Sequence, residues 1–202
     1  IRETASLMAG AGFVPIIEPV REALKGLERA LNEICSAKGE AIVIVNPFHG
    51  DHSDGGDSIS ALLEKGFLDK KGITAGILLK HDMDTAAALE CFEKHQAHSP
   101  TFIHFGFTEA KILAEKLGDL LPTTRHVFYE KYCHKLYRKH FKGAAARVLL
   151  RDGFERRRNA DHPAVESFSD LHVTYDEEDM DGFGDFLIVG DDYTEGGGPA
   201  YA

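Results

Sequence analysis

Short apolar runs recur along the chain, and each ends on a polar residue that can take part in chemistry. The runs are aliphatic or β-branched, and most are followed by a stretch in which apolar residues recur with helical spacing. Runs of this kind are typical of parallel strands that are buried on both faces. The polar residues that follow the first five runs are Glu18, Asn46, Lys80, His104 and Glu130, and a sixth run leads into Arg151 and Asp152.

The pattern predicts alternating strands and helices. We expect strands at residues 14–17, 41–45, 73–79, 101–105, 125–129 and 146–150. We expect helices at residues 2–9, 22–35, 58–65, 85–95, 109–118 and 131–141. Asp84 and Thr108 are candidate N-caps for two of these helices. After residue 152 the alternation of apolar strands and helices becomes less regular. Here we expect only a short helix at 163–168 and two further strands at 171–175 and 186–189.

This spacing favours successive βα units, and hence a (β/α)8-barrel-like α/β fold in a single domain of residues 1–202. The alternative is an open doubly wound parallel sheet, although the first strand-to-helix turn lacks the GxGxxG signature of dinucleotide-binding folds. The chain begins at Ile1 and stops in a glycine-rich stretch. We therefore expect an excerpt of a longer protein, with a barrel truncated at one or both ends.

Composition narrows the class of protein. At 43% hydrophobic residues the chain can form a substantial core, and its net charge of −10 disfavours general binding of nucleic acid. The three cysteines are widely spaced and form no disulfide framework or zinc signature, which predicts a reducing, cytoplasmic location. No apolar segment is long enough for a membrane span.

In parallel α/β folds, ligands bind at the carboxyl ends of the strands. The polar strand ends are therefore the candidate catalytic residues, together with a loop that brings two imidazoles and a carboxylate close together in sequence, residues 46–52. A late glycine-rich loop contains two adjacent carboxylates that could hold a divalent metal. The candidate catalytic residues are Glu18, Asn46, His49, Asp51, Lys80, His104, Glu130 and Asp152, and the candidate metal ligands are Asp191 and Asp192.

The segment 131–141 interleaves aromatic and basic residues. Such a helix face can stack against and neutralise a nucleic-acid strand, although it is more often solvated or docked against an acidic partner. The residues of this face are Tyr132, His134, Lys135, Tyr137, Arg138, Lys139 and His140.

Three blocks resemble one known family. They are residues 15–20 (Pro-Ile-Ile-Glu-Pro-Val), residues 43–51 with Asn46-Pro47 and Gly50-Asp51, and residues 184–192 with Gly190-Asp191-Asp192. In these blocks the chain is similar to uncharacterised bacterial proteins related to the phage-derived "beta family". The resemblance spans nearly the whole chain. It implies a barrel-like α/β fold and an occurrence in mobile or defence-related gene neighbourhoods, but no established activity.

Two hypotheses of function follow. The first is a barrel hydrolase, assisted by a divalent metal, that acts on a phosphate ester or nucleotide with the strand-end residues converging in one site. The second is a non-catalytic barrel that binds a protein encoded by a neighbouring gene, as in a defence or toxin–antitoxin pair. The first requires that the strand-end side chains share one side of the sheet.

Overall fold

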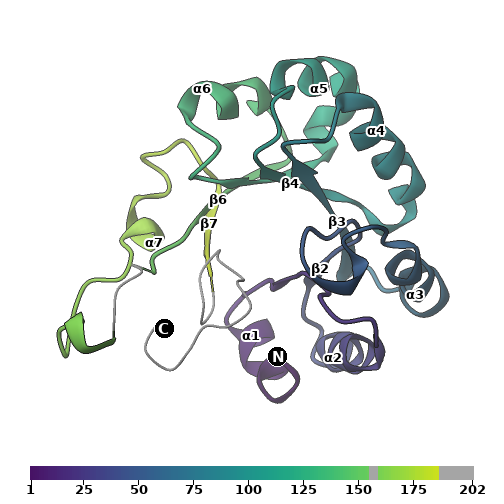
Figure 1. Ribbon diagram of the computed structural model, residues 1–202, viewed down its shortest axis with the longest axis horizontal. Helices are drawn as coiled ribbons and strands as arrows, with labels where there is room; N and C mark the ends of the chain where they lie inside the picture. The colour runs from purple at the N-terminus through teal and green to yellow at the C-terminus, as the bar shows by residue number, and fades with distance from the viewer. Residues whose placement is uncertain (155–158, 187–202) are drawn as a thin grey trace.

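Seven parallel strands form one curved sheet in the computed structural model, which describes residues 1–154 and 159–186 (Figure 1). Neighbours in the sheet are also neighbours in sequence, so the order runs from β1 to β7. The strands are β1 (Ile16–Ile17), β2 (Ala41–Ile44), β3 (Ile73–Lys80), β4 (Thr101–Phe105), β5 (Arg125–Tyr129), β6 (Ala146–Arg151) and β7 (Gly182–Asp185).

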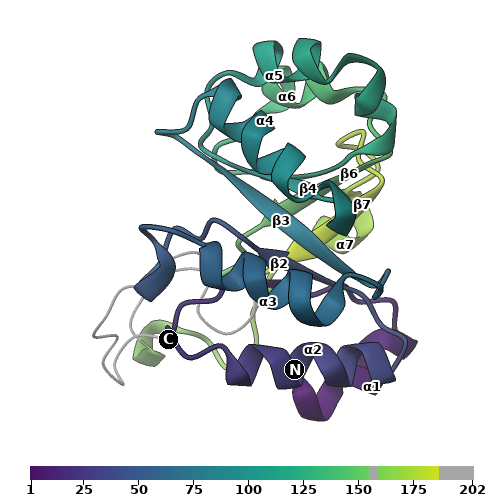
Figure 2. The same cartoon turned by 90° about the vertical axis from the view of Figure 1, so that its right-hand side faces the viewer.

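Helices follow most strands. The α-helices are α1 (Ala5–Gly10), α2 (Lys25–Ser36), α3 (Asp57–Phe67), α4 (Thr85–Lys94), α5 (Ala110–Leu117), α6 (Lys135–Arg138) and α7 (Leu171–Thr174). Short 3-10 helices lie at Arg2–Thr4, Gly50–His52, Gln96–His98, Gly118–Thr123, Lys139–Phe141 and Asn159–Asp161. Helices α2 to α6 surround the outside of the curl, and α7 flanks β7 (Figures 1 and 2). The described chain is therefore a parallel α/β half-barrel whose edge strands are β1 and β7.

Strand alternation divides the core into two layers. One set of strand side chains packs against the helices, and we call this side the outer face. The other set forms a cluster of its own without helix residues, and we call this side the inner face. The buried residues of the inner face are Ile42, Ile44, Leu78, Ile103 and Val127, with Ile16, Phe105, Val148 and Leu150 packed against them.

The inner face is tightly packed at Gly76 in β3. A Cβ atom at this position would lie 2.8 Å from a methyl group of Ile42 and 3.0 Å from one of Ile103. Glycine is the residue that lets the two isoleucine side chains meet across β3.

Six of the expected strands and the helices at α1 to α5 are confirmed, with shifts of a few residues at their ends. The Asp84 cap is also confirmed, since its carboxylate accepts a hydrogen bond from the backbone N–H of Ala87 at 2.8 Å. The Thr108 cap is wrong. Helix α5 has no side-chain cap, and the neighbouring Glu109 instead accepts bonds from the N–H and hydroxyl of Thr85.

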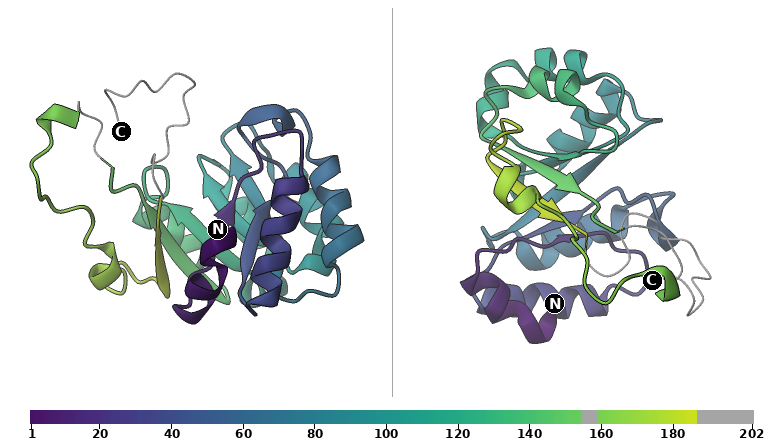
Figure 3. Two further views of the ribbon diagram at one scale, coloured as in Figure 1. Left: turned by 90° about the horizontal axis from the view of Figure 1, so that it is seen from below. Right: turned by 90° about the vertical axis from the view of Figure 1, so that its left-hand side faces the viewer.

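The last third of the chain departs most from expectation. The expected strand at 171–175 is the one-turn helix α7, in which Leu171 is buried and Tyr175, four positions later, packs against the same core. The final described strand is Gly182–Asp185, earlier than the expected 186–189, of which residues 187–189 lie outside the described ranges. No helix forms at 163–168, and the short 3-10 helix Asn159–Asp161 lies away from the sheet (Figure 3). The expected helix 131–141 is helical only from Lys135 onward.

Candidate functional site

Three of the predicted catalytic residues lie at the carboxyl edge of the sheet. Glu18 follows Ile16 by two residues, Asn46 follows Ile44, and Lys80 follows Leu78. Lys80 is the last residue of β3 and alternation puts it in phase with Leu78, whereas Glu18 and Asn46 lie just beyond the ends of β1 and β2 and are placed by their hydrogen bonds. The strands are parallel and adjacent, so their carboxyl ends lie along one edge.

Glu18 and His49 form the centre of this edge. One carboxylate oxygen of Glu18 accepts hydrogen bonds from the backbone N–H groups of Phe48 and His49, at 2.6 and 2.9 Å. The other oxygen lies 3.1 Å from Nδ1 of the His49 ring. Both side chains are about three-quarters buried, each with 24% of its surface exposed. The carboxylate therefore fixes the loop after β2 and the orientation of the imidazole.

The same contacts determine the tautomer of His49. An ionised carboxylate only accepts hydrogen bonds, so the contact requires a proton on Nδ1 of the ring. In the neutral imidazole, Nε2 is then the basic nitrogen. This arrangement of a carboxylate behind a histidine is the one that enzymes use to present a general base.

Asp51 and His52 secure the loop. The Asp51 carboxylate accepts a bond from the backbone N–H of Glu22 at 2.7 Å, and the ring of buried His52 contacts the carbonyl of Arg21 at 3.0 Å. Both bonds join the loop after β2 to the segment after β1. Asp51 is thus a positioning residue for the loop, and its carboxylate is directed to a backbone amide.

Asn46 extends the pairing of β2 with β3. Its side-chain oxygen accepts from the N–H of Leu78 at 2.8 Å, and its amide donates to the carbonyl of Leu78 at 2.9 Å. The side chain therefore substitutes for a backbone ladder step just where β2 ends. This use of both amide groups gives Asn46 a structural role at the edge.

Lys80 is half-buried at the end of β3 and is paired in register with Phe105 of β4. Its ammonium group makes no ion pair with any of the described residues. Its positive charge also acts on the Cys91 thiol of α4, where it lowers the pKa that burial raises.

His104 does not lie at this site. It is one position out of phase with Ile103 and Phe105, so it belongs to the outer face, where it is fully buried. Its Nδ1 lies 2.7 Å from the Tyr137 hydroxyl, and its Nε2 lies 2.9 Å from Nδ1 of His126. The strand pattern predicted a polar strand end, but this histidine is a core residue.

The buried histidines form a directed chain of hydrogen bonds. The Thr124 hydroxyl donates to the carbonyl of Leu121, so it must accept from Nε2 of His126, 2.9 Å away. Nδ1 of His126 then accepts from His104, and Nδ1 of His104 accepts from Tyr137. Burial lowers the pKa of His126 to about 3 and, together with the neighbouring His126, lowers that of His104 well below its ordinary value. Both rings are therefore neutral.

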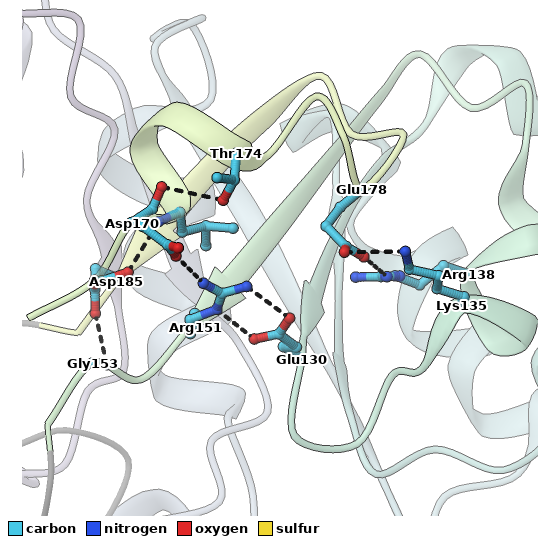
Figure 4. Close-up of polar contacts among 11 residues, drawn as sticks. Glu130, Lys135, Arg138, Arg151, Gly153, Asp170, Thr174, Glu178 and Asp185 are labelled. Atoms are coloured by element: carbon cyan, nitrogen blue, oxygen red, sulfur yellow. Dashed lines mark hydrogen bonds and ion pairs between the residues drawn. The ribbon is translucent and has the colours of Figure 1, made fainter.

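Glu130 is also directed away from the inner edge. Arg151 binds its carboxylate with two nitrogen atoms, at 2.6 and 3.1 Å, and contacts Asp170 at 2.7 Å (Figure 4). The hydrogen bond to Glu130 is the main reason that the pKa of Arg151 is raised. This ion-pair group joins β5, β6 and the segment before α7. Asp152 directly follows β6, and one of its oxygens accepts from the N–H of Phe154 at 2.9 Å.

The acidic segment before β7 is held by cations. Glu178 lies 3.1 Å from Lys135 and 2.6 Å from the buried Arg138 (Figure 4). Burial alone would raise the pKa of Glu178, but hydrogen bonds from the two cations outweigh it and lower the pKa. Arg138 therefore does not belong to an exposed basic face. Tyr137 is also partly buried and bonded to the core, so the expected basic–aromatic face of 131–141 is incomplete.

The strand pattern does not predict the aromatic cluster that lies at the inner edge. The rings of Phe105 and Tyr129 stack at 5.5 Å between centroids, and Tyr132 meets both edge-on. Phe48 lies 6.0 Å from Phe105 and 4.8 Å from the ring of His49. The pattern predicts Phe105 and Tyr129 only as strand residues. Their place in the alternation, in phase with Ile103 and Val127, is the signal that could have identified them.

The predicted eight-residue site thus does not form as a whole. Glu18 and His49 are in contact, Asn46 and Lys80 share their edge, and His104 and Glu130 face elsewhere. Among the described residues, no group of three or more histidine, cysteine or acidic side chains is arranged to hold a metal ion. The predicted metal ligands Asp191 and Asp192 lie outside the described ranges.

Within the part of the chain that the structure describes, no helix has the length and apolar character that crossing a membrane requires. A comparison of the chain with protein-family models, curated proteins and solved structures found no match in any of the three.

Proposed function

We propose that the inner carboxyl edge is the active site of a hydrolase that acts on a phosphate ester or nucleotide, with Glu18 and His49 as its acid–base pair. The contact between the Glu18 carboxylate and Nδ1 of His49 is the observation that supports this most directly. It lies at the end of the sheet where parallel α/β folds place their ligands.

The reaction would use both charge states of the imidazole. Nε2 of His49 takes a proton from a water molecule while the water oxygen bonds to phosphorus. The bond between phosphorus and the ester oxygen breaks, and the imidazolium returns its proton to that oxygen. Glu18 stabilises the imidazolium, and Lys80 supplies a positive charge for the phosphate oxygens.

Several finer statements belong to the same proposal. We propose that the half-barrel is part of a (β/α)8 barrel, that the protein is cytoplasmic, and that it is related to the "beta family". A divalent metal would depend on Asp191 and Asp192 and would supply further charge for the phosphate.

Measurement of phosphate release from a panel of nucleotides and sugar phosphates tests the proposal. We expect His49→Gln to lower kcat by about 100-fold or more, since general acid–base catalysis contributes about 10²–10⁴-fold. His81→Gln is a matched control, because His81 is an exposed histidine just after β3. Absence of turnover by the unaltered chain, or equal rates for the two variants, would contradict the proposal.

A second candidate function is a non-catalytic barrel that binds a protein partner. It is favoured by the strand-end groups that satisfy one another, Asn46 with the backbone of Leu78 and Glu130 with Arg151. The side chain of Leu136 on α6 is also 78% exposed. Co-purification with the product of a neighbouring gene would support this function, and substrate turnover by a lone monomer would exclude it.

A further inference from the structure

An aromatic surface continues from the Glu18–His49 pair along the inner carboxyl edge. The His49 ring contacts Phe48, Phe48 contacts Phe105, and Phe105 contacts Tyr132, with centroid distances of 4.8, 6.0 and 5.2 Å. These residues come from the loop after β2, the end of β4 and the turn after β5. Segments that are far apart in sequence thus contribute to one row of rings.

The row is not fully buried. If the rings served only to close the end of the barrel, we would expect all of them to be shielded from water. Tyr129 is shielded, with 1% of its surface exposed, but Phe48 and Tyr132 are 41% and 43% exposed. Each exposed ring is supported from behind by a more buried one, so each presents a fixed aromatic surface to solvent.

Positive charge accompanies the rings. Lys80 is paired in register with Phe105 and makes no ion pair with any described residue. The ammonium group of Lys131 lies 5.6 Å from the centre of the Tyr132 ring. Aromatic rings next to ammonium groups are suited to a ligand that has both a planar ring and a negative charge. A sugar phosphate offers the charge alone, whereas a nucleotide offers both.

We infer that the substrate of this edge is a nucleotide, whose base stacks on the aromatic row of Phe48, Phe105 and Tyr132 while its phosphate lies toward Lys80 and His49. The inference rests on the proposed function, because it assigns the rings and the acid–base pair to one ligand. Stacking tolerates any base, so the row selects for the presence of a base more strongly than for its identity.

Calorimetric titration with a 5′-mononucleotide and with ribose 5-phosphate tests the inference, because the two ligands differ only by the base. Stacking contributes about 1–3 kcal/mol per base, which corresponds to roughly 5- to 150-fold in affinity. We expect ribose 5-phosphate to bind at least about 10-fold more weakly than the nucleotide. We expect Phe48→Leu and Tyr132→Leu each to weaken nucleotide binding by about 5-fold or more and to leave ribose 5-phosphate binding unchanged.

Phe13→Leu is the matched control, because Phe13 is 64% exposed but precedes β1, at the opposite edge of the sheet. Thermal unfolding of each variant checks that the fold is retained. Equal affinity for the two ligands, or equal effects of all three substitutions, would overturn the inference, as would absence of nucleotide binding. Release of phosphate from both ligands with equal efficiency would support the proposed hydrolase and refute the stacking site. Binding that depends on the base but leads to no phosphate release would support the stacking site and refute the hydrolase.

Discussion

Replacement of Tyr137 by phenylalanine tests the buried hydrogen-bond chain of the outer face. The substitution removes the hydroxyl that donates to Nδ1 of His104 at 2.7 Å and changes little else in shape. Nδ1 cannot find another donor by changing tautomer, because His126 and Thr124 fix the direction of the chain. The variant therefore leaves a buried acceptor without a partner.

The expected cost follows from that unsatisfied group. A net hydrogen bond contributes about 0.5–1.5 kcal/mol, and a buried polar atom without a partner costs about 1–3 kcal/mol. Since His104 is fully buried, we expect Tyr137→Phe to lower the free energy of unfolding by about 2 kcal/mol. This would lower Tm by roughly 5 °C in a chain of this size.

Urea unfolding followed by circular dichroism measures this change. Tyr132→Phe is the matched control, because its ring is 43% exposed and its hydroxyl bonds to no described residue. Its effect should stay within about 0.5 kcal/mol. If Tyr137→Phe were as mild as the control, the directed chain from Tyr137 to Thr124 would be refuted.

Three further predictions concern stability. The pKa values of His104 and His126 are lowered in the folded state, so the stability that these residues contribute is present above pH 6.5 and is lost as pH falls. Urea unfolding should show that the free energy of unfolding falls by about 2 kcal/mol between pH 7 and pH 5.5. A free energy of unfolding that does not change over this pH range would contradict the prediction. Gly76→Ala should lower the free energy of unfolding by about 1–3 kcal/mol, because the added methyl group overpacks the inner layer. Urea unfolding measures this change, and an unchanged free energy would show that the inner layer is loosely packed. Glu178→Gln should lower the free energy of unfolding by about 1–3 kcal/mol at neutral pH, because a neutral amide is a weaker partner for the charge of buried Arg138. Equal unfolding midpoints for the variant and the unaltered chain would contradict the assigned ion pair.

The order of strands and helices could be predicted as far as β6, because each strand is an apolar run that ends in a polar residue. Prediction failed where the apolar pattern is sparse. Strand β7 contains Gly182 and Gly184, which the sequence pattern indicates as loop residues, and it owes its place to pairing with β6. Helix α7 was misassigned because a single buried leucine does not distinguish a turn of helix from a strand.

The candidate site was predicted in part for a related reason. The pattern indicates the polar residue that follows each apolar run, but only alternate positions along a strand face the inner side. Lys80 is in phase with it, whereas His104 is one position out of phase. His126, which bonds to His104, and Arg151, which bonds to Glu130, come from neighbouring strands, so the sequence alone does not indicate that these groups are already satisfied.

The claim that a nucleotide binds beside the Glu18–His49 pair is tested most directly by mapping where the ligand contacts the protein. Titration of the isotope-labelled chain with a non-hydrolysable nucleotide, followed by NMR, reports this residue by residue. We predict that the largest shifts fall on Phe48, His49 and Tyr132, with little change at His126 in the outer core. Absence of shifts at these three residues, or shifts confined to the helices of the outer face, would contradict the proposed site.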